Sequence, residues 1–364
     1  MIGILAVWVE TFLAGLLAGP GALVSRPAAL ATIPRPDHTV VVIMENHSYS
    51  SVIGNGSAPY INSLRTEGAS FTNSHGVGHP SEPNYLALFE GATENLTDDS
   101  CPHTYSAANL GSELLASGQS FVGYSESMPS DGYTGCTSGR YARRHNPWVN
   151  YRNVPASSNR TFDAFPSDFD ALPTVSYVAP NLCNDMHDCS VATGDAWLRS
   201  RMDAYVQWAK THNSLFVLTF DESDTSTNQV PTIFVGPMVQ AGDYGERVDH
   251  YRTLRTLEEM YGVPATGISA SSEPIASAWQ SAPPADTPTP TPTGIGVQET
   301  PTPIPRAPVI RLQRPPVHGP TPLPGGRRRN PRTTVRERRG RATRESLLKR
   351  QIEEQVQKEN AKGD

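Results

Sequence analysis

The amino-acid sequence predicts an α/β fold in which a mainly parallel β-sheet is sandwiched between helices. Over residues 32–280, short apolar runs rich in β-branched residues alternate with segments of helical periodicity. Such alternation is typical of a mainly parallel sheet with crossover helices. The chain has 364 residues, of which 37% are hydrophobic, so it is long enough to bury a sizeable core. We also expect a disordered C-terminal extension.

The expected elements follow from the period of the apolar residues. Strands are predicted where apolar runs are short and continuous, at residues 40–44, 120–124, 174–179, 215–220 and 232–235. Helical spacing predicts helices at residues 59–67, 109–117, 195–210 and 251–261. A further helix is expected through residues 84–89, because Pro83 suits a first helical turn. Ser81 would then lie at or near its N-cap.

Residues 1–31 are predicted to be a signal peptide or an N-terminal apolar segment. An apolar stretch is followed by small residues and by the A-x-A-like Ala29-Leu30-Ala31, so cleavage would leave Thr32 as the first residue. No Lys or Arg precedes the apolar run, and Glu10 interrupts it. A membrane anchor and a misplaced start codon are therefore the alternatives. We expect a secreted or cell-envelope protein.

The four cysteines agree with export, since an even number of cysteines in an exported chain usually forms disulfides. We favour the pairs 101–136 and 183–189, because each closes a loop-like stretch; the sequence allows three pairings. A zinc site built from all four is the alternative, although no paired C-x₂₋₄-C motif is present. The cysteines are Cys101, Cys136, Cys183 and Cys189.

The C-terminal part of the chain differs in composition from residues 32–280. Residues 281–325 are rich in Pro and Thr and are predicted to be an extended linker. Residues 326–364 are a basic tail, disordered or with a short helix. From residue 306 onward there are 16 Lys and Arg against 6 Asp and Glu, whereas the whole chain has a net charge of −6. One interpretation is electrostatic contact between this tail and an anionic cell surface; the other is a solvated tail without a partner.

Polar side chains follow three of the predicted strands. In open parallel sheets ligands bind outside the carboxyl ends of the strands, so these side chains could meet in one crevice. Carboxylate, amide and imidazole groups together suit a divalent cation such as Mg²⁺, Mn²⁺, Ca²⁺ or Zn²⁺. The residues are Glu45 and Asn46 after the first strand, Asp221 and Glu222 after residues 215–220, and Asn181, Asn184, Asp185, His187 and Asp188 after residues 174–179.

A candidate nucleophile lies in the segment HPSEPNYLALFEG, which contains His79 and Ser81. The N-terminus of a helix attracts anions, so it would favour both a bound phosphate and an ionised serine oxygen. A nearby metal ion would lower the pKa of the hydroxyl further. The simpler interpretation is that Ser81 only caps a helix and that His79 is a loop histidine.

Several ordered motifs give the chain a resemblance to a known family. The segments MEN, SAPYINSL, HPSEPNYLALFEG, NDMHD and TFDE resemble the phosphoesterase family of acid phosphatases and phosphatidylcholine-cleaving phospholipases C, within the alkaline-phosphatase-like superfamily. NLGSELL, YARRHNPWVN and GDAWL resemble its short secreted bacterial acid phosphatases. The resemblance spans residues 38–279 and implies an alkaline-phosphatase-like catalytic domain over residues 32–280.

Site residues are carried over from this resemblance motif by motif. It implies that Glu45, Asn46, Asp221 and Glu222 bind the metal and that Ser81 is the nucleophile. Asn84 would hold phosphoryl oxygens, and His79 accompanies the nucleophile. The second active-site loop would contain Asp185, His187 and Asp188, and His250 stands where related enzymes often place a late histidine. His187 is either a metal ligand or the proton donor to the leaving alcohol, and we favour the donor.

The function implied is that of a secreted, metal-dependent acid phosphatase that hydrolyses phosphomonoesters through a phosphoserine intermediate. The alternative within the family is phospholipase C action on phospholipids. An alternative of another class is a non-catalytic surface protein with a polyanion-binding basic tail. The expected substrate is therefore a small phosphomonoester or a phospholipid, and no specific nucleic-acid partner is expected.

Overall fold

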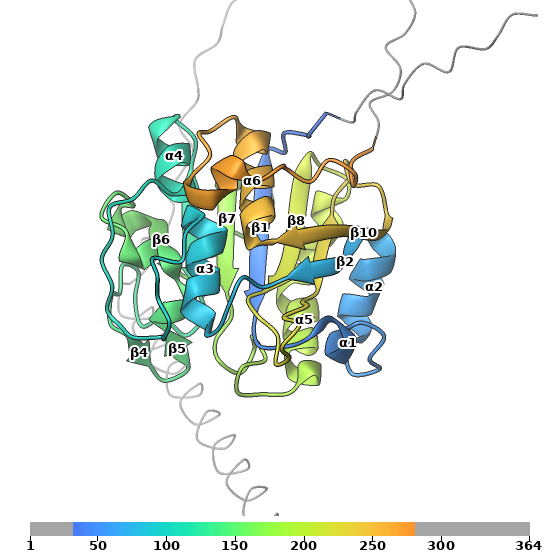
Figure 1. Cartoon of the computed structure of the whole chain (residues 1–364), viewed down its shortest axis with the longest axis horizontal. Helices are drawn as coiled ribbons and strands as arrows, with labels where there is room; N and C mark the ends of the chain where they lie inside the picture. Colours follow the sequence, from blue (N-terminus) through green and yellow to red (C-terminus); the bar gives the residue numbers. More distant parts are fainter. Residues whose placement is uncertain (1–31, 281–364) are drawn as a thin grey trace, which may run out of the picture. The chain divides into compact units, whose positions relative to one another are not determined.

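The computed structural model describes residues 32–280. This part of the chain forms an eight-stranded sheet with helices on both faces (Figure 1), which confirms the predicted fold class. Within residues 32–280, no helix combines the length and the apolar character needed to cross a membrane. The predicted N-terminal segment (1–31), linker (281–325) and basic tail (326–364) lie outside the described residues.

The central sheet is mostly parallel. Its strand order is β10-β2-β9-β8-β1-β7-β3-β6, and β9 runs antiparallel to both of its neighbours. The other pairings in this sheet are parallel. The strands are β1 (His38–Met44), β2 (Ala69–His75), β3 (Phe121–Ser125), β6 (Asn159–Thr161), β7 (Val175–Ala179), β8 (Ser214–Phe220), β9 (Thr232–Val235) and β10 (Gly242–Asp249). A separate two-stranded hairpin consists of β4 (Thr137–Ser138) and β5 (Tyr141–Ala142).

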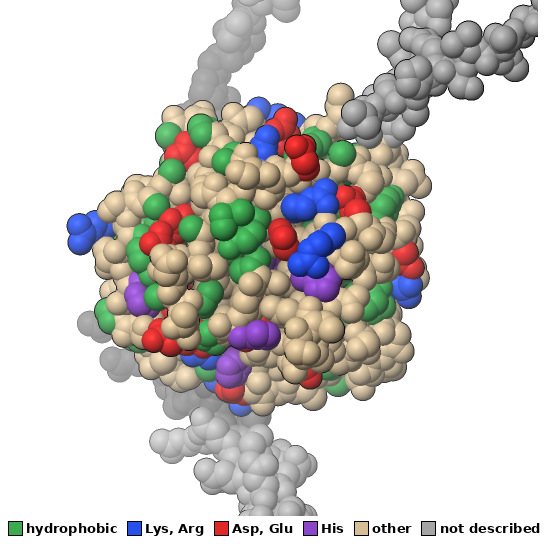
Figure 2. Space-filling model, viewed as in Figure 1, with side chains coloured by type: hydrophobic (Ala, Val, Ile, Leu, Met, Phe, Trp, Pro, Cys, Tyr) green, Lys and Arg blue, Asp and Glu red, His purple; other side chains and the backbone are tan. Residues whose placement is uncertain are grey.

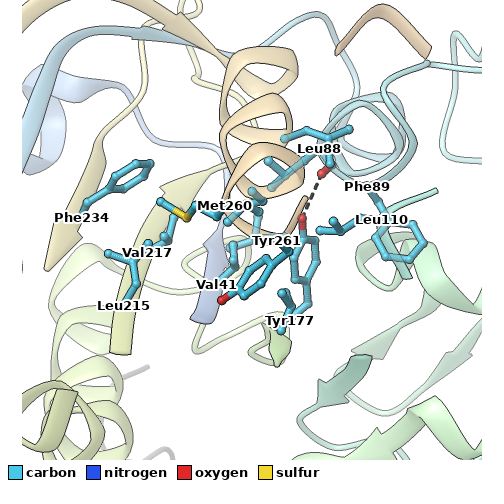
Figure 3. Packing of buried hydrophobic residues seen from close by; sticks show 14 of the residues in the cluster. Val41, Leu88, Phe89, Leu110, Tyr177, Leu215, Val217, Phe234, Met260 and Tyr261 are labelled. Atoms are coloured by element: carbon cyan, nitrogen blue, oxygen red, sulfur yellow. Dashed lines mark hydrogen bonds between the residues drawn. The ribbon is translucent and has the colours of Figure 1, made fainter. Parts of the chain in front are cut away.

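Two helical layers cover the sheet, and the alternation of side chains along β1 separates them. Val41 and Ile43 belong to a core cluster shared with helices α3, α4 and α6, part of which Figure 3 shows. Val40 and Val42 belong to the cluster on the other face, shared with α2 and α5. The helices are α1 (Tyr49–Val52), α2 (Pro59–Glu67), α3 (Ser81–Glu90), α4 (Leu110–Ala116), α5 (Val191–Ala209) and α6 (His250–Tyr261).

The structure adds strands that the apolar pattern did not predict. β2 and β10 contain mostly polar and small residues, and β10 lies at the edge of the sheet with one face exposed. An edge strand needs no continuous apolar run, so its hydrophobic signal is weak. β6, at the other edge, has only three residues. Helix α5 begins at Val191, four residues before the predicted start, because Ser190 accepts a hydrogen bond from the Thr193 amide as its N-cap.

Both favoured disulfides are present. Cys101 is bonded to Cys136, and Cys183 is bonded to Cys189. The alternative of a zinc site built from the four cysteines is therefore wrong. The first disulfide joins the segment after α3 to the hairpin β4–β5, and the second closes the loop between β7 and α5.

The sheet topology brings the predicted strand ends together. β7, β1 and β8 are neighbours and run parallel, so their carboxyl ends lie at one edge of the sheet. Backbone hydrogen bonds continue beyond the strands: the Asp221 amide donates to the Met44 carbonyl at 3.0 Å, and the Glu45 amide donates to the Asp185 carbonyl at 2.9 Å. The three segments that carry the predicted site are thus fixed to one another by main-chain contacts.

Candidate active site

Four predicted metal-binding residues lie at the ends of β1 and β8, and we call them the strand-end group: Glu45, Asn46, Asp221 and Glu222. Asn46 has a left-handed backbone with φ of 56°, a conformation that Asn tolerates better than most residues. Its amide donates to Asp221 Oδ1 at 3.1 Å, and its side chain donates to Glu45 Oε2 at 3.0 Å. The group therefore converges, as the strand ends predict.

Ser81 lies against this group. It is the first residue of α3 and directly follows the N-cap, Pro80. The buried hydroxyl donates to Glu45 Oε2 at 3.0 Å. Tyr85, one turn further along α3, donates to the other oxygen of Glu45 at 2.5 Å. Ser81 thus lies next to the N-cap, near the predicted position, and its hydroxyl contacts a carboxylate of the strand-end group.

Asn84 and His79 connect the start of α3 to the end of β8. Asn84 Oδ1 accepts from the amides of Val77 and Gly78 at 2.8 and 3.2 Å. Its side-chain nitrogen lies 3.4 Å from Glu222 Oε2, to which His79 Nδ1 also comes within 2.7 Å. Asn84 thus holds the loop in front of the nucleophile, and half of the His79 side chain is exposed at the rim of the site.

The start of α3 is already occupied in part by a carboxylate. The Glu82 amide donates to Asp99 Oδ1 at 2.8 Å, so this helix-terminal N–H is not free for a phosphate oxygen. The positive end of the helix dipole still faces the region of Ser81. Asp99 lies two residues before Cys101, so the first disulfide fixes the segment that carries it.

A second set of residues comes from two loops, and we call it the loop group: Arg144, His145, Asp185 and His187. His145 is 2% exposed and stacks on Tyr85 with ring centroids 5.1 Å apart. Its Nε2 lies 3.1 Å from Glu45 Oε1, and its Nδ1 lies 3.2 Å from Asp185 Oδ2. His145 therefore connects the loop group to the strand-end group through Glu45.

His187 lies at the outer side of the loop group. Its amide donates to Asp185 Oδ1 at 2.8 Å, and its Nδ1 lies 2.7 Å from Asp188 Oδ1. Arg144 Nη2 donates to the remaining ring nitrogen, Nε2, at 3.1 Å, which assigns the ring proton to Nδ1. His187 is partly exposed, so it can meet a substrate that enters from solvent.

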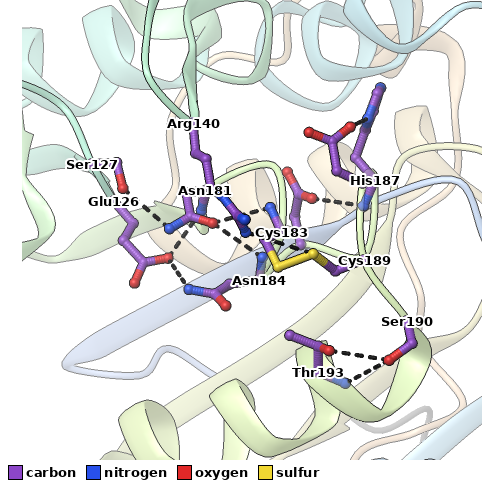
Figure 4. The surroundings of a disulfide bond; sticks show 12 residues. Glu126, Ser127, Arg140, Asn181, Cys183, Asn184, His187, Cys189, Ser190 and Thr193 are labelled. Atoms are coloured by element: carbon purple, nitrogen blue, oxygen red, sulfur yellow. Dashed lines mark hydrogen bonds and ion pairs between the residues drawn. A yellow bond between two sulfur atoms is a disulfide. The ribbon is translucent and has the colours of Figure 1, made fainter. Parts of the chain in front are cut away.

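The loop that carries Asp185 and His187 is held from several sides (Figure 4). Asn181 Oδ1 accepts from the amides of Cys183 and Asn184, and Asn184 donates to Glu126 at 2.8 Å. The disulfide between Cys183 and Cys189 closes the same loop. Asn181 and Asn184 thus hold the loop in place, whereas Asp185 and His187 belong to the loop group of the site.

His250, the first residue of α6, supports the site from the interior. Its Nε2 donates to the backbone carbonyl of Asp221 at 2.5 Å, and the ring is 2% exposed. Burial lowers its pKa, so it stays neutral. The structure therefore places His250 behind the strand-end group, in contact with main chain rather than with the other predicted side chains.

The acidic side chains of the site have strongly raised pKa values. Burial is the largest cause for each of them. The pKa of Glu45 is raised well above its usual range by desolvation and then by Asp221 and Asp185. Desolvation and Glu222 raise the pKa of Asp221 to about 8, and desolvation raises that of Asp185 to about 7. Buried carboxylates at such close range repel one another when they are ionised, so a bound cation would stabilise them strongly.

Orphaned polar atoms show where a cation would fit. Asp221 Oδ2, Asp185 Oδ2 and His145 Nε2 are buried and make no hydrogen bond. One ligand atom each from Glu45, His145 and Asp185 lies within 4.8 Å of the others, which suits a single divalent ion. This set shares Glu45 with the ligands that the resemblance implies and adds two residues of the loop group.

His145 was not among the predicted site residues. It lies in YARRHNPWVN, a segment that contributes to the family resemblance but follows no predicted strand. It stands in a short 3₁₀ turn, Arg143–His145, after the hairpin β4–β5. The only sequence signal was the presence of a histidine in a motif of the resemblance.

Sequence comparison shows which known proteins the chain is similar to. Residues 55–264 match the model of the Phosphoesterase family. The chain is 49% identical over 284 residues to a phosphatidylinositol-3-phosphatase of Mycobacterium tuberculosis, covering 77% of this chain and 93% of that one. It is 29% identical to a probable acid phosphatase of Kluyveromyces lactis, and this match covers 62% of this chain. It is 28% identical to an acid phosphatase of Aspergillus fumigatus, and this match also covers 62% of this chain. It spans 58% and 55% of the length of these two fungal relatives.

Among solved structures, the chain is similar to a protein of the alkaline phosphatase superfamily from Vibrio parahaemolyticus. The TM-score is 0.49 at 12% sequence identity, with 70% of this chain and 76% of that one covered.

The protein belongs to the phosphoesterase family, since the family match covers more than half of the chain. Within that family, its relatives are phosphatases. The protein is therefore a phosphoric ester hydrolase, and its substrates are phosphate esters.

Proposed function

We propose that the protein is a metal-dependent phosphomonoesterase of the acid phosphatase type that transfers the phosphoryl group to Ser81. The observation that carries the proposal is the buried Ser81 hydroxyl, 3.0 Å from Glu45 Oε2 at the start of α3, beside a cluster of carboxylates and histidines. A serine oxygen held by a carboxylate at a helix N-terminus is the arrangement that an activated nucleophile requires.

The orphaned atoms described above support a divalent cation at this cluster. Glu45 would be a ligand in either set, with Asn46, Asp221 and Glu222 on one side and His145 and Asp185 on the other. When bound, such an ion lowers the pKa of a nearby hydroxyl and stabilises negative charge on phosphoryl oxygens. The oxygen and nitrogen donors allow Mg²⁺, Mn²⁺, Ca²⁺ or Zn²⁺.

The chemistry assigned to the protein's own residues has two steps. Ser81 Oγ passes its proton to Glu45 Oε2, which accepts its hydrogen bond, and attacks phosphorus, so that an Oγ–P bond forms while the bond to the leaving alcohol breaks. His187 is the favoured donor of a proton to the leaving oxygen, because its ring is partly exposed and lies beside the buried His145, with ring centroids 6.0 Å apart. Water then hydrolyses the phosphoserine, which releases inorganic phosphate and restores Ser81.

For the substrate we favour a phosphomonoester on a small or lipid-linked alcohol. The name of the 49% identical relative, phosphatidylinositol-3-phosphatase, makes a phosphorylated inositol headgroup the first natural substrate to test. The phospholipase C alternative would cleave a diester and release a phosphorylated headgroup. The non-catalytic alternative would bind polyanions through the basic tail without turnover.

One set of assays separates these alternatives. The full-length protein is incubated with para-nitrophenyl phosphate, with vesicles containing phosphatidylinositol 3-phosphate and with vesicles of phosphatidylcholine, each with and without a chelator. We expect release of inorganic phosphate from the first two and loss of both activities with chelator. Release of phosphocholine instead would favour the phospholipase C alternative, and no turnover of any substrate would contradict the proposal.

We also propose that the protein is secreted or resides in the cell envelope. The two disulfides support this, since such bonds persist mainly in oxidising compartments. Expression of the full chain and immunodetection in culture medium, envelope and cytoplasm tests the proposal. Recovery of the uncleaved chain only from the cytoplasm, with four free thiols, would contradict it.

A further inference from the structure

Arg144 belongs to the loop group, where it contacts His187, and the mechanism above gives it no role. The turn Arg143–His145 directs its three side chains to different places. Arg143 is buried and donates to the Thr134 carbonyl at 2.6 Å and to Asn150 at 3.0 Å. His145 reaches Glu45, whereas Arg144 reaches His187. The inward-facing neighbours thus anchor Arg144 at the edge of the site.

A phosphate group entering this site meets a cluster of carboxyl groups, which are ionised once a cation is bound because the cation favours their charged form. Glu45, Asp185, Asp221 and Glu222 are all buried there, and Asp99 and Asp188 lie at the rim. Substrate phosphomonoesters carry up to two negative charges, so a single divalent ion leaves the surroundings anionic. A further fixed positive charge is needed for the phosphoryl oxygens. Figure 2 shows histidine and acidic side chains exposed on one face of the described part of the chain.

The guanidinium of Arg144 lies beside His187 and Asp99, and its Nε donor has no hydrogen-bond partner. Nη2 lies 3.1 Å from His187 Nε2, and Nε lies 3.7 Å from Asp99 Oδ2. Nε is buried and makes no hydrogen bond, so its N–H is available. Asp99 accepts from the amide of Glu82, the residue after Ser81. Asp99 therefore connects the start of α3, next to Ser81, with the side chain of Arg144.

We propose that Arg144 binds the non-bridging oxygens of the substrate's phosphoryl group and that Asp99 is its positioning residue. The inference rests on the proposed function of the same site. A planar guanidinium with parallel N–H donors matches two oxygens of a phosphate, which a point charge such as lysine does less well. Asp99 holds the side chain beside α3, and the first disulfide fixes Asp99 through Cys101.

The test compares phosphate binding in the full-length protein loaded with Mn²⁺. The variants are Arg144→Gln, Arg144→Lys and Asp99→Asn. The matched control is Arg140→Gln, an exposed arginine of the same hairpin segment, whose side chain lies 3.6 Å from Cys189 Sγ. For each protein we measure the Kd of inorganic phosphate by calorimetry, kcat and KM on para-nitrophenyl phosphate, and bound Mn²⁺.

We expect Arg144→Gln to weaken phosphate binding by at least about tenfold, since charge-assisted hydrogen bonds are lost, while bound Mn²⁺ stays unchanged. Arg144→Lys should recover part of the affinity, Asp99→Asn should have a smaller effect of the same sign, and Arg140→Gln should stay within about twofold of wild type.

Unchanged phosphate affinity in Arg144→Gln would overturn the inference, as would an equal loss in Arg140→Gln or a parallel loss of Mn²⁺. Failure of the proposed function looks different: the wild-type protein itself would neither hydrolyse para-nitrophenyl phosphate nor bind phosphate, which would overturn both.

Discussion

The strand-end group and the loop group meet at Glu45 but are built by different means. Glu45 and Asp221 directly follow neighbouring parallel strands, and backbone hydrogen bonds fix their positions. His145 and His187 come from loops that gain their order from two disulfides and from side-chain amides. The sheet thus supplies the buried carboxylates, whereas the braced loops supply the groups that face the entering substrate. We expect substitutions in the strand-end group to abolish catalysis and substitutions in the loops to change its rate.

The largest effect is expected at Ser81, where α3 meets Glu45. Ser81→Ala should lower kcat by about a thousandfold or more, because it removes the proposed nucleophile. Pro80 rather than Ser81 is the N-cap of α3, so the Tm should stay close to that of wild type. Steady-state kinetics and thermal unfolding check both points. A folded Ser81→Ala protein that retains wild-type kcat would refute the assignment.

The next effect compares one residue from each group. Asp221→Asn and His145→Gln should both weaken metal binding, and a loss of about 10 to 100-fold in affinity is expected where a ligand or its support is removed. Chelation of the wild type should inactivate it reversibly. Equilibrium dialysis with elemental analysis measures the bound ion. If only Asp221→Asn loses metal, the cation lies in the strand-end group alone; if neither does, the proposed centre is wrong.

A smaller effect is expected from the disulfide of the β7–α5 loop. Replacing both Cys183 and Cys189 by Ser should lower kcat/KM more than stability, because this bond closes a short loop that presents Asp185 and His187. Thermal unfolding and assays with para-nitrophenyl phosphate measure the two effects. Full activity in the double variant would show that the loop needs no covalent brace.

The smallest effect concerns the pH dependence of the metal-free protein. The pKa values of Asp221 and Asp185 are about 8 and 7, against 3.8 without the protein environment, so the folded state binds more protons than the unfolded state. The contribution of these two groups to the stability of the folded state should therefore be highest at pH 4 and below. It should fall as the pH rises toward 8. Added Mn²⁺ should raise the Tm more at pH 8 than at pH 5. Thermal unfolding at several pH values tests this, and an opposite trend would contradict the pKa assignment.

The sequence predicted the strand-end group because its signal is local. A buried apolar run ending in Glu45 and Asn46 gives both the strand and the site, and the parallel topology brings its end beside Asp221. Strands β2 and β10 escaped prediction because they contain mostly polar and small residues, and β6 escaped it because it has only three residues. The partnership of His145 with Asp185 could not be predicted, since it depends on how two irregular loops close over the sheet. Periodicity carries no information on such contacts.

Trapping of the covalent intermediate shows directly whether the phosphoryl group passes through Ser81. The full-length protein is mixed with a phosphomonoester labelled in its phosphate, quenched in acid within milliseconds and digested for mass spectrometry. Phosphoryl transfer through Ser81 predicts label on the peptide that contains Ser81, and no label in Ser81→Ala. Turnover with inversion at phosphorus and no labelled peptide would contradict it.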